Sequence, residues 1–134
     1  MTQPALDHLG APGLRAFFNI AEQWRLSDLQ QAAILGISEL STLQKCKSAA
    51  KAREEVSLGT ETLDRIGLVL GIFRAINVLL PDPGRADSWM HAPNDAPVFR
   101  GCSPIELMTD NSSNGLKLMH RYLIAECGGF NEEK

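Results

Sequence analysis

The chain has 134 residues, of which 44% are hydrophobic and 22% are charged, and its net charge is -3. These values are typical of a globular protein with one domain, or one domain and a small satellite, and they exclude a wholly disordered chain. Aromatic residues make up only 6% of the sequence. Leu, Ile and Ala must therefore form most of the core, which favours helices.

The cysteines and the N-terminal residues both argue against a secreted protein. Cys46, Cys102 and Cys127 are odd in number and form no CxxC pair, unlike a disulfide framework. No basic segment followed by an apolar one marks a secretion signal. The most apolar stretch, residues 66–80, contains Arg74 and is too short to cross a bilayer. We therefore expect a cytoplasmic protein without membrane contact.

The N-terminal part of the chain changes character near Leu14. Residues 1–13 contain two prolines and two glycines, which predicts a flexible N-terminal arm. From Leu14 onward the sequence predicts a helix, because large apolar residues recur on one side. These residues are Phe17, Phe18, Ala21 and Trp24.

The stretch RLSDLQQAAILGISELSTLQKCK predicts two short helices joined by a turn. Ser27 followed by Gln30 fits a capping box that begins the first helix. Gly36 can adopt the left-handed conformation that ends it. Ser38 can cap the second helix, which we expect to run to about Ser48. Two short helices joined by a glycine turn are typical of a helix-turn-helix.

The second of these helices carries side chains that suit the major groove of DNA. Hydroxyls, an amide and lysines can bond base edges and phosphates. The candidates are Ser38, Ser41, Thr42, Gln44, Lys45 and Lys47. The alternative is a plain solvated helix face. We assign residues 14–58 to a DNA-binding and dimerisation region.

The register of the second helix stays open at this point. A helix-turn-helix commonly has a buried aliphatic residue six positions after the turn glycine. Here that position is Thr42, and Leu43 follows one place later. Either the turn is one residue longer, or the second helix is rotated by about a hundred degrees, the angle per residue of a helix.

Residues 60–80 form the strongest helical pattern in the chain, with apolar side chains most of the way round. Such a helix is either central in a core or shared with a partner subunit, and we expect a homodimer formed through it. The helix ends at Pro81. Asp82 and Pro83 then begin a short helix that carries Trp89.

The stretch SWMHAPNDAPVFRGCSPIELM combines an irregular loop with large apolar side chains. Two prolines between Trp89 and Phe99 prevent a helix or strand from running through. The sequence SPIE from Ser103 is a strong helix start. Trp89 and Phe99 either pack under the loop as a local core or belong to a recognition surface. In both cases we expect Asn94, Asp95 and Arg100 to face outward.

A last amphipathic helix over residues 116–126 precedes Gly128 and Gly129, and Phe130 follows in a short tail. Phe130 either folds back onto this helix or anchors a partner. No segment alternates convincingly with period two. We therefore expect an all-α fold, in which residues 59–134 form a second helical domain with the long helix and a C-terminal tail.

The sequence offers no residue set for catalysis. The three histidines are far apart and not spaced for a metal, and no glycine-rich phosphate loop occurs. Cys46 could act as a nucleophile only with a base, and the sequence nominates none. We expect no enzyme, no cofactor and no metal site.

With these motifs in view, residues 26–130 resemble the antitoxins of the Xre/MbcA/ParS type. The resemblance rests on the segments LGIS…STLQ, TLDRIGLVLGIFRAINVLLPD, ADSWMHAPNDAPVFRGCSPIELM and RYLIAECGGF, of which the third is the most specific. It implies an Xre-like helix-turn-helix followed by a toxin-binding domain, in a dimer that represses its own operon. In the best-matching subgroup, the toxin is a RES-domain enzyme that degrades NAD.

The resemblance also implies which residues contact the toxin. Carried over position by position, they are Trp89, Asn94, Phe99, Arg100, Tyr122, Gly128, Gly129 and Phe130. The expected partners are a RES-domain toxin, operator DNA and a second copy of the chain. The alternative is a stand-alone helix-turn-helix regulator whose C-terminal half only dimerises or senses a ligand. A toxin gene beside this one would distinguish the two.

Overall fold

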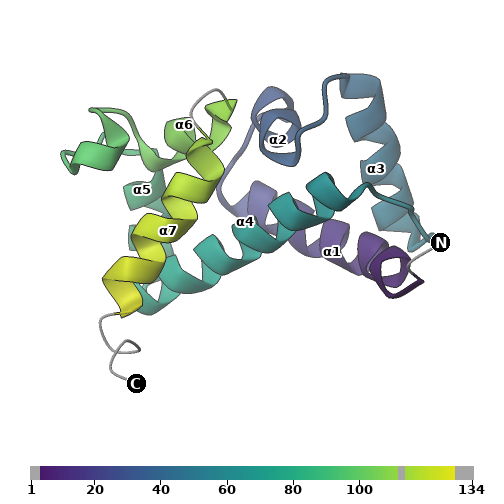
Figure 1. The fold of residues 1–134 in the computed structure, drawn as a ribbon, viewed down its shortest axis with the longest axis horizontal. Helices are drawn as coiled ribbons and strands as arrows, with labels where there is room; N and C mark the ends of the chain where they lie inside the picture. The colour runs from purple at the N-terminus through teal and green to yellow at the C-terminus, as the bar shows by residue number, and fades with distance from the viewer. Residues whose placement is uncertain (1–3, 112–113, 129–134) are drawn as a thin grey trace. The chain divides into compact units, whose positions relative to one another are not determined.

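The computed structural model describes residues 4–111 and 114–128, with side chains from residue 11 onward (Figure 1). These residues form helices and no strand, which confirms the predicted all-α fold. The elements are α1 Pro4–Gln23, α2 Asp28–Leu35, α3 Leu40–Ala52, α4 Thr60–Leu79, α5 Pro83–His91, the 3-10 turn η1 Pro97–Phe99, α6 Pro104–Thr109 and α7 Gly115–Gly128. None of the helices in the described residues is both long and apolar enough to span a bilayer.

The chain forms two compact units, residues 1–67 and 68–134. Their boundary lies inside α4, whereas the sequence placed it at residues 58 and 59, in the loop before this helix. The difference has a simple cause. A loop is the usual boundary between domains, but the first turns of α4 contact the first unit and its remaining turns belong to the second.

The first unit begins with a helix that the sequence did not predict in full. We expected a flexible arm over residues 1–13, but α1 begins at Pro4 and continues through Pro12. Ala11 and Leu14 are buried. Packing of these residues outweighs the missing backbone N–H of Pro12, which alone favours a break. The predicted apolar face that follows is confirmed, because Phe17, Ala21 and Trp24 are buried.

Helix α2 begins and ends as its sequence predicts. Ser27 Oγ accepts from the Gln30 backbone N–H at 3.1 Å, and Gln30 Oε1 accepts from the Ser27 N–H at 2.8 Å. These two bonds form the capping box. At the other end, Gly36 has φ 77°, and its N–H donates to the carbonyls of Ala32 and Ala33. This left-handed residue turns the chain towards α3.

The first turns of α4 complete the C-terminal end of α2. Thr62 Oγ1 donates to the Leu35 carbonyl at 3.3 Å, and Arg65 Nη1 donates to the Ile34 carbonyl at 3.2 Å. These carbonyls lie in the last turn of α2, where no intrahelical partner exists and where a positive charge is favourable. Helix α4 thereby holds the end of α2 in place.

Helix α3 begins later than its sequence suggests. Its N-cap is Glu39, which makes no side-chain cap bond, so the expected cap at Ser38 is wrong. The helix extends past Ser48 to Ala52. Leu43, Cys46 and Ala50 are its buried residues, and they pack towards α1 and α2.

The second unit contains the rest of α4 and the helices α5 to α7. The predicted start of α6 is confirmed, because Ser103 and Glu106 form a capping box with bonds of 2.9 and 3.1 Å. Helices α6 and α7 pack against each other. Their connection requires Gly115, since a Cβ there would lie 1.7 Å from the Leu107 carbonyl oxygen.

The turn at Gly36 generates a testable prediction. Gly36→Ala should destabilise the protein by about 1–2 kcal/mol, because an L-residue in the left-handed region is strained by about that amount. Its Cβ would also lie 3.0 Å from Arg65 Nε. Urea unfolding measures the change. The matched control is Gly67→Ala in α4, where a Cβ meets nothing within 4 Å and where alanine should stabilise the helix. Equal midpoints for both variants would contradict the strain argument.

Candidate functional site

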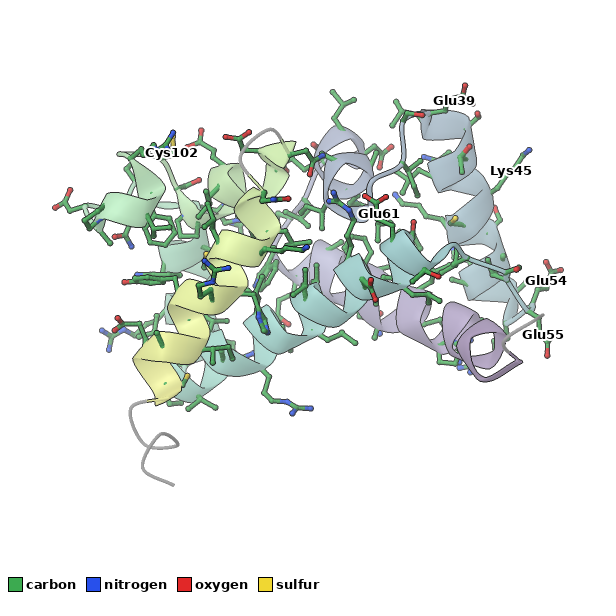
Figure 2. The ribbon with its side chains drawn as sticks, viewed as in Figure 1. Glu39, Lys45, Glu54, Glu55, Glu61 and Cys102 are labelled. Carbon is green, nitrogen blue, oxygen red and sulfur yellow. The ribbon has the colours of Figure 1, made fainter. Side chains whose placement is uncertain are left out.

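The exposed face of α3 carries the residues predicted to contact DNA. Ser38, Ser41, Thr42, Gln44 and Lys45 are exposed, and Lys47 is half-buried. Figure 2 shows Lys45 pointing away from α3. Lys45 makes no hydrogen bond or ion pair with any described residue. The structure therefore leaves this lysine available for a phosphate or a base.

The open question about the register of α3 is answered by burial. Leu43 is fully buried, whereas Thr42 is exposed. Together with an N-cap at Glu39, one residue after the expected Ser38, this indicates a turn that is one residue longer than in the common pattern, and the aliphatic residue still enters the core. Buried residues at 43, 46 and 50 follow helical spacing. Thr42 and Lys45 consequently remain on the outer side.

Two of the predicted DNA-binding residues already have a partner within the protein. Lys47 Nζ lies 2.8 Å from Asp28 Oδ1, and Gln44 Nε2 donates to Asp28 Oδ2 at 3.2 Å. The Lys47 ammonium also lies 5.9 Å from the centre of the Phe18 ring, within range of a cation–π contact. Of the six predicted residues, Gln44 and Lys47 are thus held by Asp28, and the other four make no hydrogen bond or ion pair with it.

A groove with a volume of about 670 Å³ lies beside this pair. Residues of α1, α2 and α3 line it, and Asp28 and Lys47 are among them. Three further cations, Arg15, Lys51 and Arg53, line the same groove, and their side chains have no ion-pair partner among the described residues. Unpaired cations beside α3 create a positive potential that attracts a polyanion.

In the second unit, three of the residues predicted to bind a toxin form one aromatic cluster. The Phe99 ring centre lies 5.9 Å from that of Trp89 and 5.1 Å from that of Tyr122, both edge-to-face. This geometry is favourable for aromatic pairs. Phe99 is only 1% exposed, whereas Trp89 and Tyr122 are half-buried. Phe99 is therefore a core residue under the loop, which is one of the two alternatives that the sequence left open for this side chain.

Hydrogen bonds close the loop above this cluster. The Asn94 N–H donates to the Cys102 carbonyl at 3.1 Å, and the Asn94 side-chain oxygen accepts from the Ala96 N–H at 2.9 Å. The Cys102 N–H donates to the Phe99 carbonyl at 2.8 Å. Asn94 is half-buried and shapes the loop, so only part of its amide remains for a partner.

Arg100 is the most exposed of the predicted toxin contacts whose side chains the structure describes. It is exposed and has φ 51°, so its backbone turns the loop while its guanidinium faces solvent. Burial, and to a lesser extent the nearby Glu126 carboxylate, raise the pKa of the Tyr122 phenol. Gly128 is the last residue of α7. Gly129 and Phe130 lie outside the described residues.

Sequence reasoning missed the part that Asp28 plays in this site. Asp28 was not among the residues that the sequence nominated, and as an acid in the first turn of α2 it has a simple local role beside the helix dipole. Its bonds to Gln44 and Lys47 span 16 and 19 residues. The only available signal was the helix-turn-helix itself, in which α2 lies across α3.

Burial raises the pKa of the Cys46 thiol, which makes it a poor nucleophile.

Comparison with known proteins agrees with this arrangement. Residues 9–71 match the family model of the antitoxin Xre-like helix-turn-helix domain, and residues 74–129 match that of the antitoxin Xre/MbcA/ParS C-terminal toxin-binding domain. The chain is also 34% identical over 129 residues to the uncharacterized protein y4oB of Sinorhizobium fredii, covering 96% of this chain and 95% of that protein. The chain belongs to the Xre/MbcA/ParS family of antitoxins.

Proposed function

We propose that this antitoxin neutralises a RES-domain toxin that degrades NAD, and that it represses its own operon by binding the promoter in the cytoplasm. The observation that carries the proposal is the order of the two matched domains in one chain. The first contains a helix-turn-helix with an exposed, unpaired Lys45 on α3. The second matches a toxin-binding domain. The RES class of toxin rests on the sequence resemblance.

We assign DNA binding to the outer face of α3, with its N-terminal half in the major groove. Ser38, Ser41 and Thr42 offer hydroxyls to phosphates or base edges. Gln44 offers an amide, which can pair with adenine. Lys45 supplies an unpaired charge, whereas Lys47 shares its charge with Asp28. Sequence preference therefore depends most on Gln44, and affinity most on Lys45.

Gln44→Ala and Lys45→Ala should have different effects on promoter binding. Lys45→Ala should weaken binding to every sequence and reduce the salt dependence by about one phosphate contact. Gln44→Ala should instead lower the preference for the promoter over random DNA by about fivefold or more. Gel-shift titrations at several salt concentrations measure both. A protein with no preference for its own promoter at moderate salt would contradict autorepression.

We assign toxin binding to the loop around Arg100, to Tyr122 and Trp89 beside it, and to the C-terminal tail. The buried Phe99 supports this surface from below. The tail contains Phe130, which follows two glycines and lies beyond the predicted end of the last helix. We expect its ring to enter a pocket on the toxin. The alternative is that Phe130 folds back onto the last helix.

Deleting residues 128–134 should impair growth rescue in cells that express the toxin, while operator binding by the free antitoxin stays nearly unchanged. A deeply buried aromatic anchor contributes about 2 kcal/mol at an interface, which corresponds to roughly thirtyfold in Kd. Phe130→Ala should reproduce part of this loss. If the truncated protein binds toxin as tightly as the full chain, the contact lies on the loop instead, and Arg100→Glu should then abolish rescue. If DNA binding persists but the toxin is never bound, the protein is a stand-alone regulator.

We also propose that the protein is a homodimer that uses α4. Val78 on this helix is 60% exposed, and Leu70 and Phe73 are half-buried. Val78→Asp should yield a monomer that remains folded, because this position is exposed within one chain. Light scattering at micromolar concentration measures the mass. The matched control is Leu29→Asp on α2, where the leucine is 71% exposed. An unmodified protein that is monomeric would exclude the dimer.

A further inference from the structure

We infer that Asp28 increases the DNA specificity of this antitoxin, by suppressing random binding more than operator binding. The inference rests on the proposed binding of DNA by α3. Its structural basis is that one carboxylate holds two neighbouring donors of α3. Asp28 Oδ1 accepts from Lys47 and Oδ2 accepts from Gln44, at 2.8 and 3.2 Å.

The first effect of Asp28 is on the charge of Lys47. Random DNA is bound almost entirely through its phosphates, and each phosphate contact adds a fixed increment to the salt dependence. Lys47 is paired with a carboxylate, and its ammonium also lies beside the Phe18 ring. A phosphate must therefore compete with Asp28 for this lysine. Lys45 has no such competitor among the described residues.

The second effect is on the orientation of Gln44. An exposed glutamine samples many rotamers, and ordering it upon binding is unfavourable. The bond to Asp28 occupies one amide hydrogen of Gln44 and fixes the plane of the amide. The second amide hydrogen and Oε1 remain for a base, and together they match the N7 and N6 groups of adenine. Asp28 thus prepares the group that distinguishes sequences.

The third effect is direct repulsion. Asp28 is about half exposed, with 48% of its side-chain surface accessible, so its carboxylate faces any phosphate that approaches α2 and α3. This repulsion lowers the affinity for operator and random DNA alike. The competition for Lys47 and the repulsion thus weaken binding through phosphates, and the orientation of Gln44 restores affinity only at the operator.

Asp28→Asn in the full chain tests the inference. Random duplex should bind about threefold or more tightly at low salt, and the slope of log K against log salt should steepen by about 0.9, the value for one added phosphate contact. The ratio of operator to random affinity should fall by about fivefold or more, since a good bidentate base contact is worth at least that factor. Fluorescence anisotropy with both duplexes across a salt series gives all three quantities.

Two matched controls separate this role from a simple change of net charge. Glu39→Gln removes an exposed acid at the N-terminal end of α3, and Glu54→Gln removes one beyond its C-terminal end (Figure 2). Neither residue holds Gln44 or Lys47 in the structure. Each variant should tighten operator and random binding by the same factor. Equal loss of preference in Asp28→Asn and Glu39→Gln would overturn the inference.

A double-mutant cycle tests whether Asp28 acts through Lys47. In a Lys47→Gln background, Asp28→Asn should no longer steepen the salt slope. Lys47→Gln alone should reduce the slope less than Lys45→Gln does, and this comparison stands even if Asp28→Asn fails to fold. If the unmodified protein shows no operator preference, the proposed function fails. If it shows preference and Asp28→Asn keeps the same ratio, only the inference about Asp28 fails.

Discussion

The geometry of the helix-turn-helix depends on the hydrogen bonds that the free carbonyls at the C-terminal end of α2 accept. Gly36 turns the chain in a left-handed conformation, and the first turns of α4 donate to the carbonyls of Ile34 and Leu35 through Arg65 and Thr62. Unsatisfied carbonyls at a helix end are unfavourable when they are removed from water. Helix α4 supplies these bonds, and the left-handed turn at Gly36 directs the chain into α3, which buries Leu43.

The same arrangement explains why some polar side chains of α3 face solvent while others contact Asp28 on α2. Burial of Leu43 and Cys46 turns Lys45 outward, while Gln44 and Lys47 come within reach of Asp28 at the start of α2. A DNA-binding surface benefits from cations for affinity, but cations alone do not distinguish sequences. An acid beside the recognition helix lowers affinity and favours sequence contacts, and we propose that this is the role of Asp28.

In the second unit, buried side chains and backbone hydrogen bonds fix the loop between α5 and α6. Phe99 packs between Trp89 and Tyr122, and backbone bonds from Asn94 and Cys102 close the loop above it. Large apolar side chains on an irregular segment therefore serve as its local core. The surface that remains for a partner consists of the half-buried rings and the exposed Arg100. A preformed loop of this kind binds with a smaller loss of conformational entropy than a flexible one.

The sequence alone was enough to predict the helix starts at Ser27 and Ser103, the turn at Gly36 and the long helix from Thr60. These features depend on caps, turn residues and periodicity, which act over only a few residues. The motifs also identified the family. Only the tertiary structure decided three other points. Helix α1 runs through Pro12, Phe99 lies in the core, and Asp28 contacts Gln44 and Lys47. Each of these depends on packing or bonding between residues distant in sequence, which no local pattern records.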